Sequence, residues 1–108
     1  GLELKFDATR EGAFVIMEVN QRSESERLAM YEKLEKYKVI FEEYIQDPLV
    51  WDFAFVRESG QEVCRIYCQK SGIDIHRRSQ WNDFYSFMAS RMLQMEQVFW
   101  DLKEIITA

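Results

Sequence analysis

The sequence has few of the residues that interrupt or cross-link a chain, with four glycines, one proline, two cysteines and one histidine among 108 residues. The glycines are spread singly, so no glycine-rich loop is present to bind the phosphates of a nucleotide. The single histidine has no serine or cysteine nucleophile motif to accompany it, as a hydrolase would require. No apolar run approaches the roughly 18–20 residues that span a bilayer. We therefore expect no catalytic residue, no cofactor and no membrane segment.

The two cysteines lie in the segment CRIYC, as Cys64 and Cys68. On a strand, side chains four residues apart point to the same face at a distance of about 13 Å, which is too far for a disulfide. A metal ion would need more ligands than two thiols. We predict buried, unpaired thiols, which fit a reducing cytoplasm, and no metal site.

The composition is that of one folded domain. Of the 108 residues, 47% are hydrophobic and 15% are aromatic, which is enough for a packed core. The net charge of −5 disfavours general binding to the phosphate backbone of nucleic acids. We expect a single domain over residues 1–108. Because the strand-like LELKF follows Gly1 at once, we also expect that a natural N-terminal segment is missing.

Alternating apolar residues predict four strands in two hairpins. The first hairpin joins residues 2–6 to residues 13–19, and the second joins residues 51–56 to residues 63–69. The strand over 13–19 is almost wholly apolar, which is typical of a central strand covered on both faces. The segment IDI at residues 73–75 would add a short fifth strand or a bend.

Two helices follow the hairpins. Ser23 and Glu26 match a capping box, and apolar residues then recur at helical spacing as far as Tyr44, which predicts one helix over residues 23–45. A second helix begins near Trp81 and continues to the C-terminal region. The sequence thus predicts an α+β fold, in the order β-β-α-β-β-α, with a mainly antiparallel sheet of four or five strands and two long helices on one face.

Several segments together resemble a known family. They are AFVIMEV in the first hairpin, RLAMYEKL in the first helix, the strands WDF and CRIY, and WNDF and VFWDLK at the two ends of the last helix. This pattern resembles the bacterial family of domain of unknown function 4268 (DUF4268) over nearly the whole chain. The resemblance implies a bacterial cytoplasmic domain, with some relatives attached to nuclease-like domains. It implies no catalytic residues.

A three-residue fragment matches part of a metal-dependent nuclease site. Such sites place acids on adjacent strands, often with a lysine two positions after one of them, as Glu3 and Lys5 are spaced. Alternation on the surface of an edge strand explains this fragment better. Glu18 and Asp52, at strand ends, are the other acids of interest.

Basic residues gather in the second half of the chain. Between residues 57 and 91 there are six basic and four acidic side chains, a balance of +2. The candidate anion-binding residues are Arg65, His76, Arg77, Arg78 and Arg91. Two of the arginines precede the predicted N-terminus of the last helix, where free backbone N–H groups favour anions. Pairing with the chain's own acids is the favoured alternative.

The last helix has more apolar residues than one stripe accommodates. Phe87, Val98 and Trp100 lie off the centre of the stripe and form a candidate interaction surface. One alternative is that the helix buries a wide arc against the sheet and the helix over 23–45, and we favour it. The other is that this flank contacts a second protomer, a partner chain or the missing N-terminal segment.

These observations give two functional hypotheses. The first is a non-enzymatic protein-interaction or accessory module of a bacterial cytoplasmic protein, which acts through its last helix and pairs as a two-fold homodimer. The alternative is a nucleic-acid or phosphate-binding accessory domain associated with nuclease or defence proteins.

Overall fold

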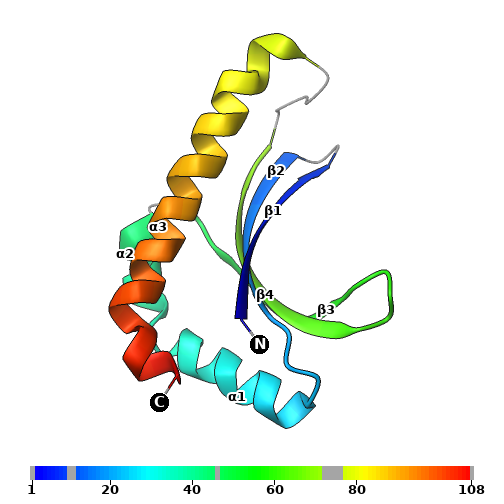
Figure 1. The fold of residues 1–108 in the computed structure, drawn as a ribbon, viewed down its shortest axis with the longest axis vertical. Helices are drawn as coiled ribbons and strands as arrows, with labels where there is room; N and C mark the ends of the chain where they lie inside the picture. The colour runs from blue at the N-terminus through cyan, green and yellow to red at the C-terminus, as the bar shows by residue number, and fades with distance from the viewer. Residues whose placement is uncertain (1, 10–11, 46, 72–76, 108) are drawn as a thin grey trace.

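The computed structural model describes residues 2–9, 12–45, 47–71 and 77–107. The strands are β1 (Leu2–Thr9), β2 (Gly12–Val19), β3 (Val50–Val56) and β4 (Glu62–Lys70). The helices are α1 (Glu24–Glu35), α2 (Lys38–Ile45) and α3 (Trp81–Thr107), and a short 3₁₀ turn η1 (Arg78–Gln80) leads into α3. Figure 1 shows the curved sheet with the helices beside one of its faces. The predicted α+β class is confirmed.

The four strands form one antiparallel sheet in the order β1-β2-β4-β3. The two predicted hairpins therefore lie side by side and meet where β2 pairs with β4. Gly12 begins β2 at a φ of 135°, and a Cβ atom there would lie 2.2 Å from the backbone carbonyl oxygen of Lys70. Only glycine fits this position without moving β4. The segment 73–75, where a further strand was possible, lies outside the described residues.

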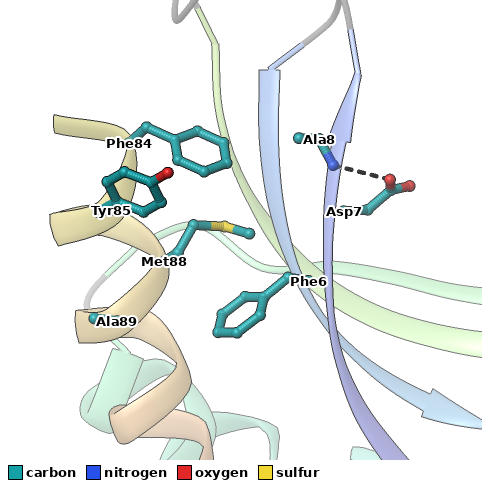
Figure 2. A pocket seen from close by; sticks show the side chains of 7 residues that line it. All are labelled: Phe6, Asp7, Ala8, Phe84, Tyr85, Met88 and Ala89. Atoms are coloured by element: carbon teal, nitrogen blue, oxygen red, sulfur yellow. Dashed lines mark hydrogen bonds between the residues drawn. The ribbon is translucent and has the colours of Figure 1, made fainter. Parts of the chain in front are cut away.

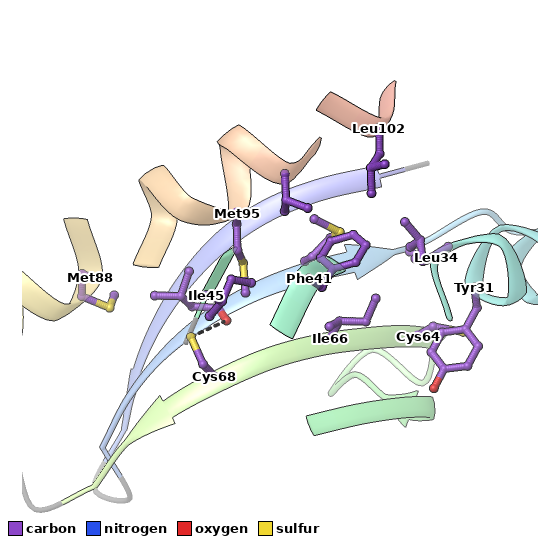
Figure 3. Packing of buried hydrophobic residues seen from close by; sticks show 14 of the residues in the cluster. Tyr31, Leu34, Phe41, Ile45, Cys64, Ile66, Cys68, Met88, Met95 and Leu102 are labelled. Atoms are coloured by element: carbon purple, nitrogen blue, oxygen red, sulfur yellow. Dashed lines mark hydrogen bonds between the residues drawn. The ribbon is translucent and has the colours of Figure 1, made fainter. Parts of the chain in front are cut away.

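The core lies between the sheet and the helices. Alternate side chains of β2 and β4 point to this side, where they meet Leu34 of α1, Phe41 of α2 and Met95 of α3, all fully buried (Figure 3). The core side chains of the two central strands are Ala13, Val15, Met17, Val19, Cys64, Ile66 and Cys68. Trp51 of β3 closes one end of the core, with the ring of Phe41 edge-on at 5.8 Å. The alternation of residues along these strands thus directs one face of the sheet to the core.

The helix predicted over residues 23–45 is two helices. Ser23 caps α1 as predicted, since its hydroxyl accepts the N–H of Glu26. The N–H of Tyr37 then donates to the carbonyl of Leu34, a tighter bond that ends α1 and lets the chain change direction before α2. No glycine or proline marks this break, so the sequence pattern did not reveal it. The consequence is that α2 packs along α3 while α1 packs against the sheet.

Candidate interaction surface

Of the three residues predicted for the interaction surface, two belong to the core. Phe87 and Val98 are both buried, whereas Trp100 is exposed. Both side chains belong to the buried cluster between the sheet and the helices, and α2 packs along α3, where the Tyr44 hydroxyl donates to Asp101. Phe87 and Val98 are therefore corrected to core residues, in agreement with the wide internal burial that we favoured.

The side of α3 that faces away from the core is itself partly apolar. Tyr85, Leu93 and Trp100 are 60%, 65% and 66% exposed, and their spacings of eight and seven residues place them on one side of the helix. Ala89, also exposed, lies between the first two. The Lys103 ammonium lies 4.7 Å from the centre of the Trp100 ring, which leaves the rest of the indole in solvent. The helix thus has an exposed apolar stripe opposite its buried one.

A groove separates the first turns of α3 from strand β1. Its volume is about 540 Å³, and its lining consists of Phe6, Asp7, Ala8, Phe84, Tyr85, Met88 and Ala89. Figure 2 shows Phe6 pointing from β1 toward α3, and Phe84 pointing from α3 toward the sheet. The Phe6 side chain is 53% exposed, although it lies on the same face of β1 as Leu2 and Leu4, which are half-buried against the core. The groove is therefore apolar and open.

The groove and the stripe share Tyr85 and Ala89, whereas the exposed polar residues Glu96 and Gln97 lie between Leu93 and Trp100 along the helix. We call the groove and the stripe together the β1–α3 surface and define it by Phe6, Tyr85, Ala89, Leu93 and Trp100. Exposed apolar surfaces on soluble proteins commonly mark a contact with another molecule. Of the residues that define this surface, the sequence therefore predicted Trp100 and missed the others.

The residues predicted to bind an anion do not come together. Arg65 lies on the helix-free face of the sheet, where its Nε donates to Glu18. Arg91 lies on the helix side, where its guanidinium pairs with Asp47. Arg77 and Arg78 are exposed at the start of the helical segment, and His76 lies outside the described residues. Arg65 and Arg91 are thus paired with acids of the same chain. This is the alternative to anion binding that we favoured from the sequence.

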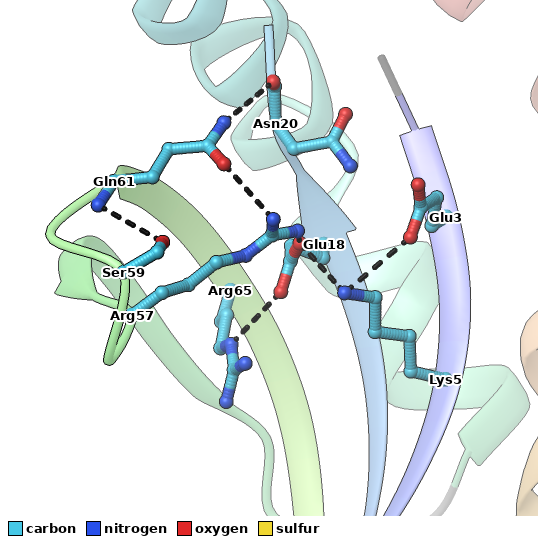
Figure 4. A network of polar contacts seen from close by, with 8 residues as sticks. All are labelled: Glu3, Lys5, Glu18, Asn20, Arg57, Ser59, Gln61 and Arg65. Atoms are coloured by element: carbon cyan, nitrogen blue, oxygen red, sulfur yellow. Dashed lines mark hydrogen bonds and ion pairs between the residues drawn. The ribbon is translucent and has the colours of Figure 1, made fainter. Parts of the chain in front are cut away.

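The helix-free face of the sheet has a buried carboxylate, Glu18 (Figure 4). Lys5 donates to its Oε1 at 3.0 Å and Arg65 to its Oε2 at 3.1 Å, and Arg57 also pairs with Oε1. Arg57 in turn donates to the amide oxygen of Gln61 at 2.9 Å. Three basic side chains from β1, β4 and the turn after β3 thus neutralise and cover one acid. Sequence alone did not indicate this network.

The same network accounts for the nuclease-like fragment. Lys5 lies 3.4 Å from Glu3 as well as 3.0 Å from Glu18, so its ammonium joins two acids on neighbouring strands. Side-chain hydrogen bonds, first from Asn20 and then from Lys5, lower the pKa of the Glu3 carboxyl. Across the described residues there is no group of three or more histidine, cysteine or acidic side chains that could hold a metal ion. These acids are occupied by internal partners.

The Arg65 side chain also covers part of the helix-free face of the sheet. Its guanidinium lies 3.8 Å from the centre of the Phe55 ring, and burial lowers its pKa. Phe14 and Tyr67 meet edge-on beside it, with ring centres 5.8 Å apart. Ile16 is consequently buried although it points away from the helices. This face of the sheet is covered by its own side chains.

Both cysteines are free and buried, as predicted. They belong to the core face of β4 (Figure 3), and burial raises the pKa of the Cys68 thiol to about 11. Burial also raises the pKa of Cys64. Thiols in this state are neutral, weakly reactive apolar groups, so their role is in packing.

Among the described helices, including the long α3, there is none with both the length and the apolar character that crossing a membrane requires.

The fold and the surface define an α+β domain whose exposed features are an open sheet edge and an apolar helix face. The chain belongs to the family described as "Domain of unknown function (DUF4268)", whose family model matches residues 1–103. This match confirms the resemblance noted in the sequence over nearly the whole chain. No curated protein and no solved structure matches the chain.

Proposed function

We propose that this domain is a protein-interaction module that associates with a second copy of itself through the β1–α3 surface. The observation that supports the proposal is the exposure of Phe6, Tyr85, Leu93 and Trp100 along the groove and the stripe, which meet at Tyr85. The free energy of the system falls when another surface covers large apolar side chains that are this exposed. The region therefore favours association over isolation in water.

The size of the surface suits a modest homodimer. From the 150–250 Å² that a fully covered aromatic side chain buries, the exposed parts of these four residues contribute on the order of 500 Å². A standard interface buries roughly 800 Å² on each partner, and the remainder comes from a polar rim. Asp7 and Lys103 border the apolar residues and supply charges for such a rim. A second copy of the chain has the same apolar residues and the same bordering charges, and it is the partner that we propose.

A bacterial cytoplasmic setting remains part of the proposal. Two free, buried thiols suit a reducing compartment. The alternative, nucleic-acid or phosphate binding, has less support, because Arg65 and Arg91 lie on opposite faces of the sheet and each is paired with an acid. We therefore retain the interaction module as the function that the structure supports best.

Sedimentation and light scattering over a range of protein concentrations test this proposal. The chain has a mass of 13.0 kDa, and we expect a reversible rise to twice that mass. Leu93→Glu and Trp100→Glu place a charge on the β1–α3 surface and are expected to weaken association at least tenfold. Val39→Glu is the matched control, since Val39 is an equally exposed apolar residue on α2. A chain that stays monomeric at every concentration would refute the proposal.

A further inference from the structure

The two edges of the sheet differ in how well they could accept another strand. β3 pairs with β4 irregularly, with a register shift between Asp52 and Phe55. Bulges of this kind make an edge unsuitable for further pairing. β1 pairs with β2 without interruption from Leu2 to Thr9. The outer edge of β1 is therefore the regular edge of this sheet.

The backbone of β1 has donors that face away from β2. The N–H of Ala8 donates to the Asp7 carboxylate at 2.9 Å, so it is not used by β2. In an antiparallel pair, residues alternate between those bonded to one neighbour and those bonded to the other. Leu4 and Phe6, two and four positions earlier, therefore share the outward direction of Ala8. These three N–H groups, at alternate positions of the strand, face the open edge, and that of Ala8 is bonded to the Asp7 carboxylate.

The side chains of β1 are complementary to a second, antiparallel β1. When the two-fold axis passes through Phe6, Lys5 of each copy lies opposite Asp7 of the other. Leu4 then lies opposite Ala8, and seven residues of each strand, Glu3 to Thr9, can pair. An axis through Lys5 would instead place lysine opposite lysine and Glu3 opposite Asp7. Cross-strand pairs of opposite charge stabilise a sheet and like charges destabilise it.

An axis through Leu4 is the remaining alternative with opposite charges paired, since Glu3 would face Lys5. It pairs at most five described residues of each strand, Leu2 to Phe6, and leaves Asp7 and Ala8 unpaired. The axis through Phe6 gives the longer ladder. It also brings the two Phe6 rings together on the helix face, beside the groove between β1 and α3 (Figure 2).

We propose that two copies of this chain join edge to edge, β1 against β1, in an antiparallel register centred on Phe6, so that the two sheets become one of eight strands. This inference rests on the proposed function, self-association, and specifies the contact that produces it. Main-chain hydrogen bonds supply the pairing, as in other cases of strand addition. The Lys5–Asp7 pairs and the Phe6 rings fix the register.

Cysteine cross-linking tests the register. Residues directly opposite each other in a hydrogen-bonded pair have Cα atoms about 5.5 Å apart, within the range that a disulfide spans. Phe6→Cys alone is expected to form a disulfide-linked dimer under mild oxidation. Leu4→Cys and Ala8→Cys are each expected to remain uncross-linked alone and to cross-link when mixed. The native chain is the control, because Cys64 and Cys68 are buried.

A charge reversal gives a second measurement that keeps Phe6 in place. Asp7→Lys puts lysine opposite Lys5 of the other copy and is expected to weaken association at least tenfold. Glu58→Lys makes the same charge change at an exposed position of the turn between β3 and β4, away from the outer edge of β1, and is expected to have little effect.

The outcomes separate the two proposals. Cross-linking of Leu4→Cys alone, with no effect of Asp7→Lys, would overturn the register centred on Phe6. A dimer by mass that shows neither cross-linking at β1 nor sensitivity at Asp7 would overturn edge pairing and leave the proposed self-association standing. A monomer at every concentration would remove both.

Discussion

Replacement of Glu18 by glutamine should destabilise the fold more than any other change of a single charge on the helix-free face. Glu18 is fully buried, and its carboxylate is bonded by Lys5, Arg57 and Arg65. Loss of one partner of a buried ion pair typically costs about 3–5 kcal/mol. The side chains of the three basic residues remain 31%, 27% and 17% exposed, so they can regain part of their hydration. We therefore expect a loss near the lower end, about 3 kcal/mol.

Urea denaturation followed by circular dichroism measures this loss. A change of about 3 kcal/mol lowers the ratio of folded to unfolded protein by more than a hundredfold. The midpoint should fall while the slope m stays constant, because the surface exposed on unfolding is the same. Glu62→Gln, at an exposed position on β4, is the matched control and should change stability by less than about 0.5 kcal/mol.

A double-mutant cycle with Arg65→Gln separates the ion pair from other effects of the substitution. Since Glu18 and Arg65 share one network, their combined loss should be smaller than the sum of the single losses by about 1 kcal/mol or more. Additive losses, or a loss below about 1 kcal/mol for Glu18→Gln alone, would show that the carboxylate does not hold the three strands together.

Three further results are expected. The Cys68 thiol has its pKa raised from 9.0 to about 11 by burial, so the unfolded chain loses this proton first, and its contribution to stability should be lost as the pH rises from 9 to 11. Gly12→Ala should cost more than about 2 kcal/mol, because the new Cβ would meet the backbone of β4, whereas Gly60→Ala, with φ 89° and open space around it, should cost about 1 kcal/mol. Phe87→Ala should cost about 3–4 kcal/mol, whereas Trp100→Ala should leave the stability of the monomer nearly unchanged and weaken association.

Each of these results has its own comparison. The titration of Cys68 is isolated by comparing the pH dependence of unfolding with that of Cys68→Ala, which should be flatter above pH 9. Equal effects of alanine at Gly12 and Gly60 in thermal melts would contradict the close approach of Gly12 to β4. A large loss of monomer stability for Trp100→Ala, measured at low protein concentration, would show that this indole has an internal role.

The strands could be predicted because each has a simple period. LELKF places Leu2, Leu4 and Phe6 on one side, and in the structure Leu2 and Leu4 pack against the core while Phe6 is exposed beside it. The nearly continuous apolar run of β2 correctly indicated a central strand. The residue pattern thus determined the sheet, since side-chain direction alternates along β1, β2 and β4, whose pairing is regular.

The break between α1 and α2 could not be predicted from the same pattern. The apolar stripe continues through Tyr37 without a glycine or proline, so local preferences favour a straight helix. Packing decides otherwise, because α1 packs on the sheet while α2 packs along α3. Phe87 and Val98 belong to the same core cluster, and their burial depends on this packing between elements rather than on their own helix.

The polar network escaped prediction for a different reason. Glu18 interrupts an apolar strand, and from sequence its partners could be any of the basic residues. Lys5, Arg57 and Arg65 are separated from it by between 13 and 47 positions, and only the strand order brings them together. The β1–α3 surface was missed in part because Phe6 and Tyr85 each fitted a core stripe, while the groove between them arises from the spacing of β1 and α3.

The position of Glu18 has a consequence for how the chain finds its fold. Each hairpin forms from neighbouring residues, but the contact of β2 with β4 joins segments about 50 positions apart and forms after a larger loss of chain entropy. If β2 and β4 met one residue out of step, side chains would change faces, and the charge of Glu18 would enter the apolar layer beneath the helices. That misaligned state is penalised by the desolvation of an unpaired carboxylate. Glu18 therefore favours the correct alignment of β2 with β4.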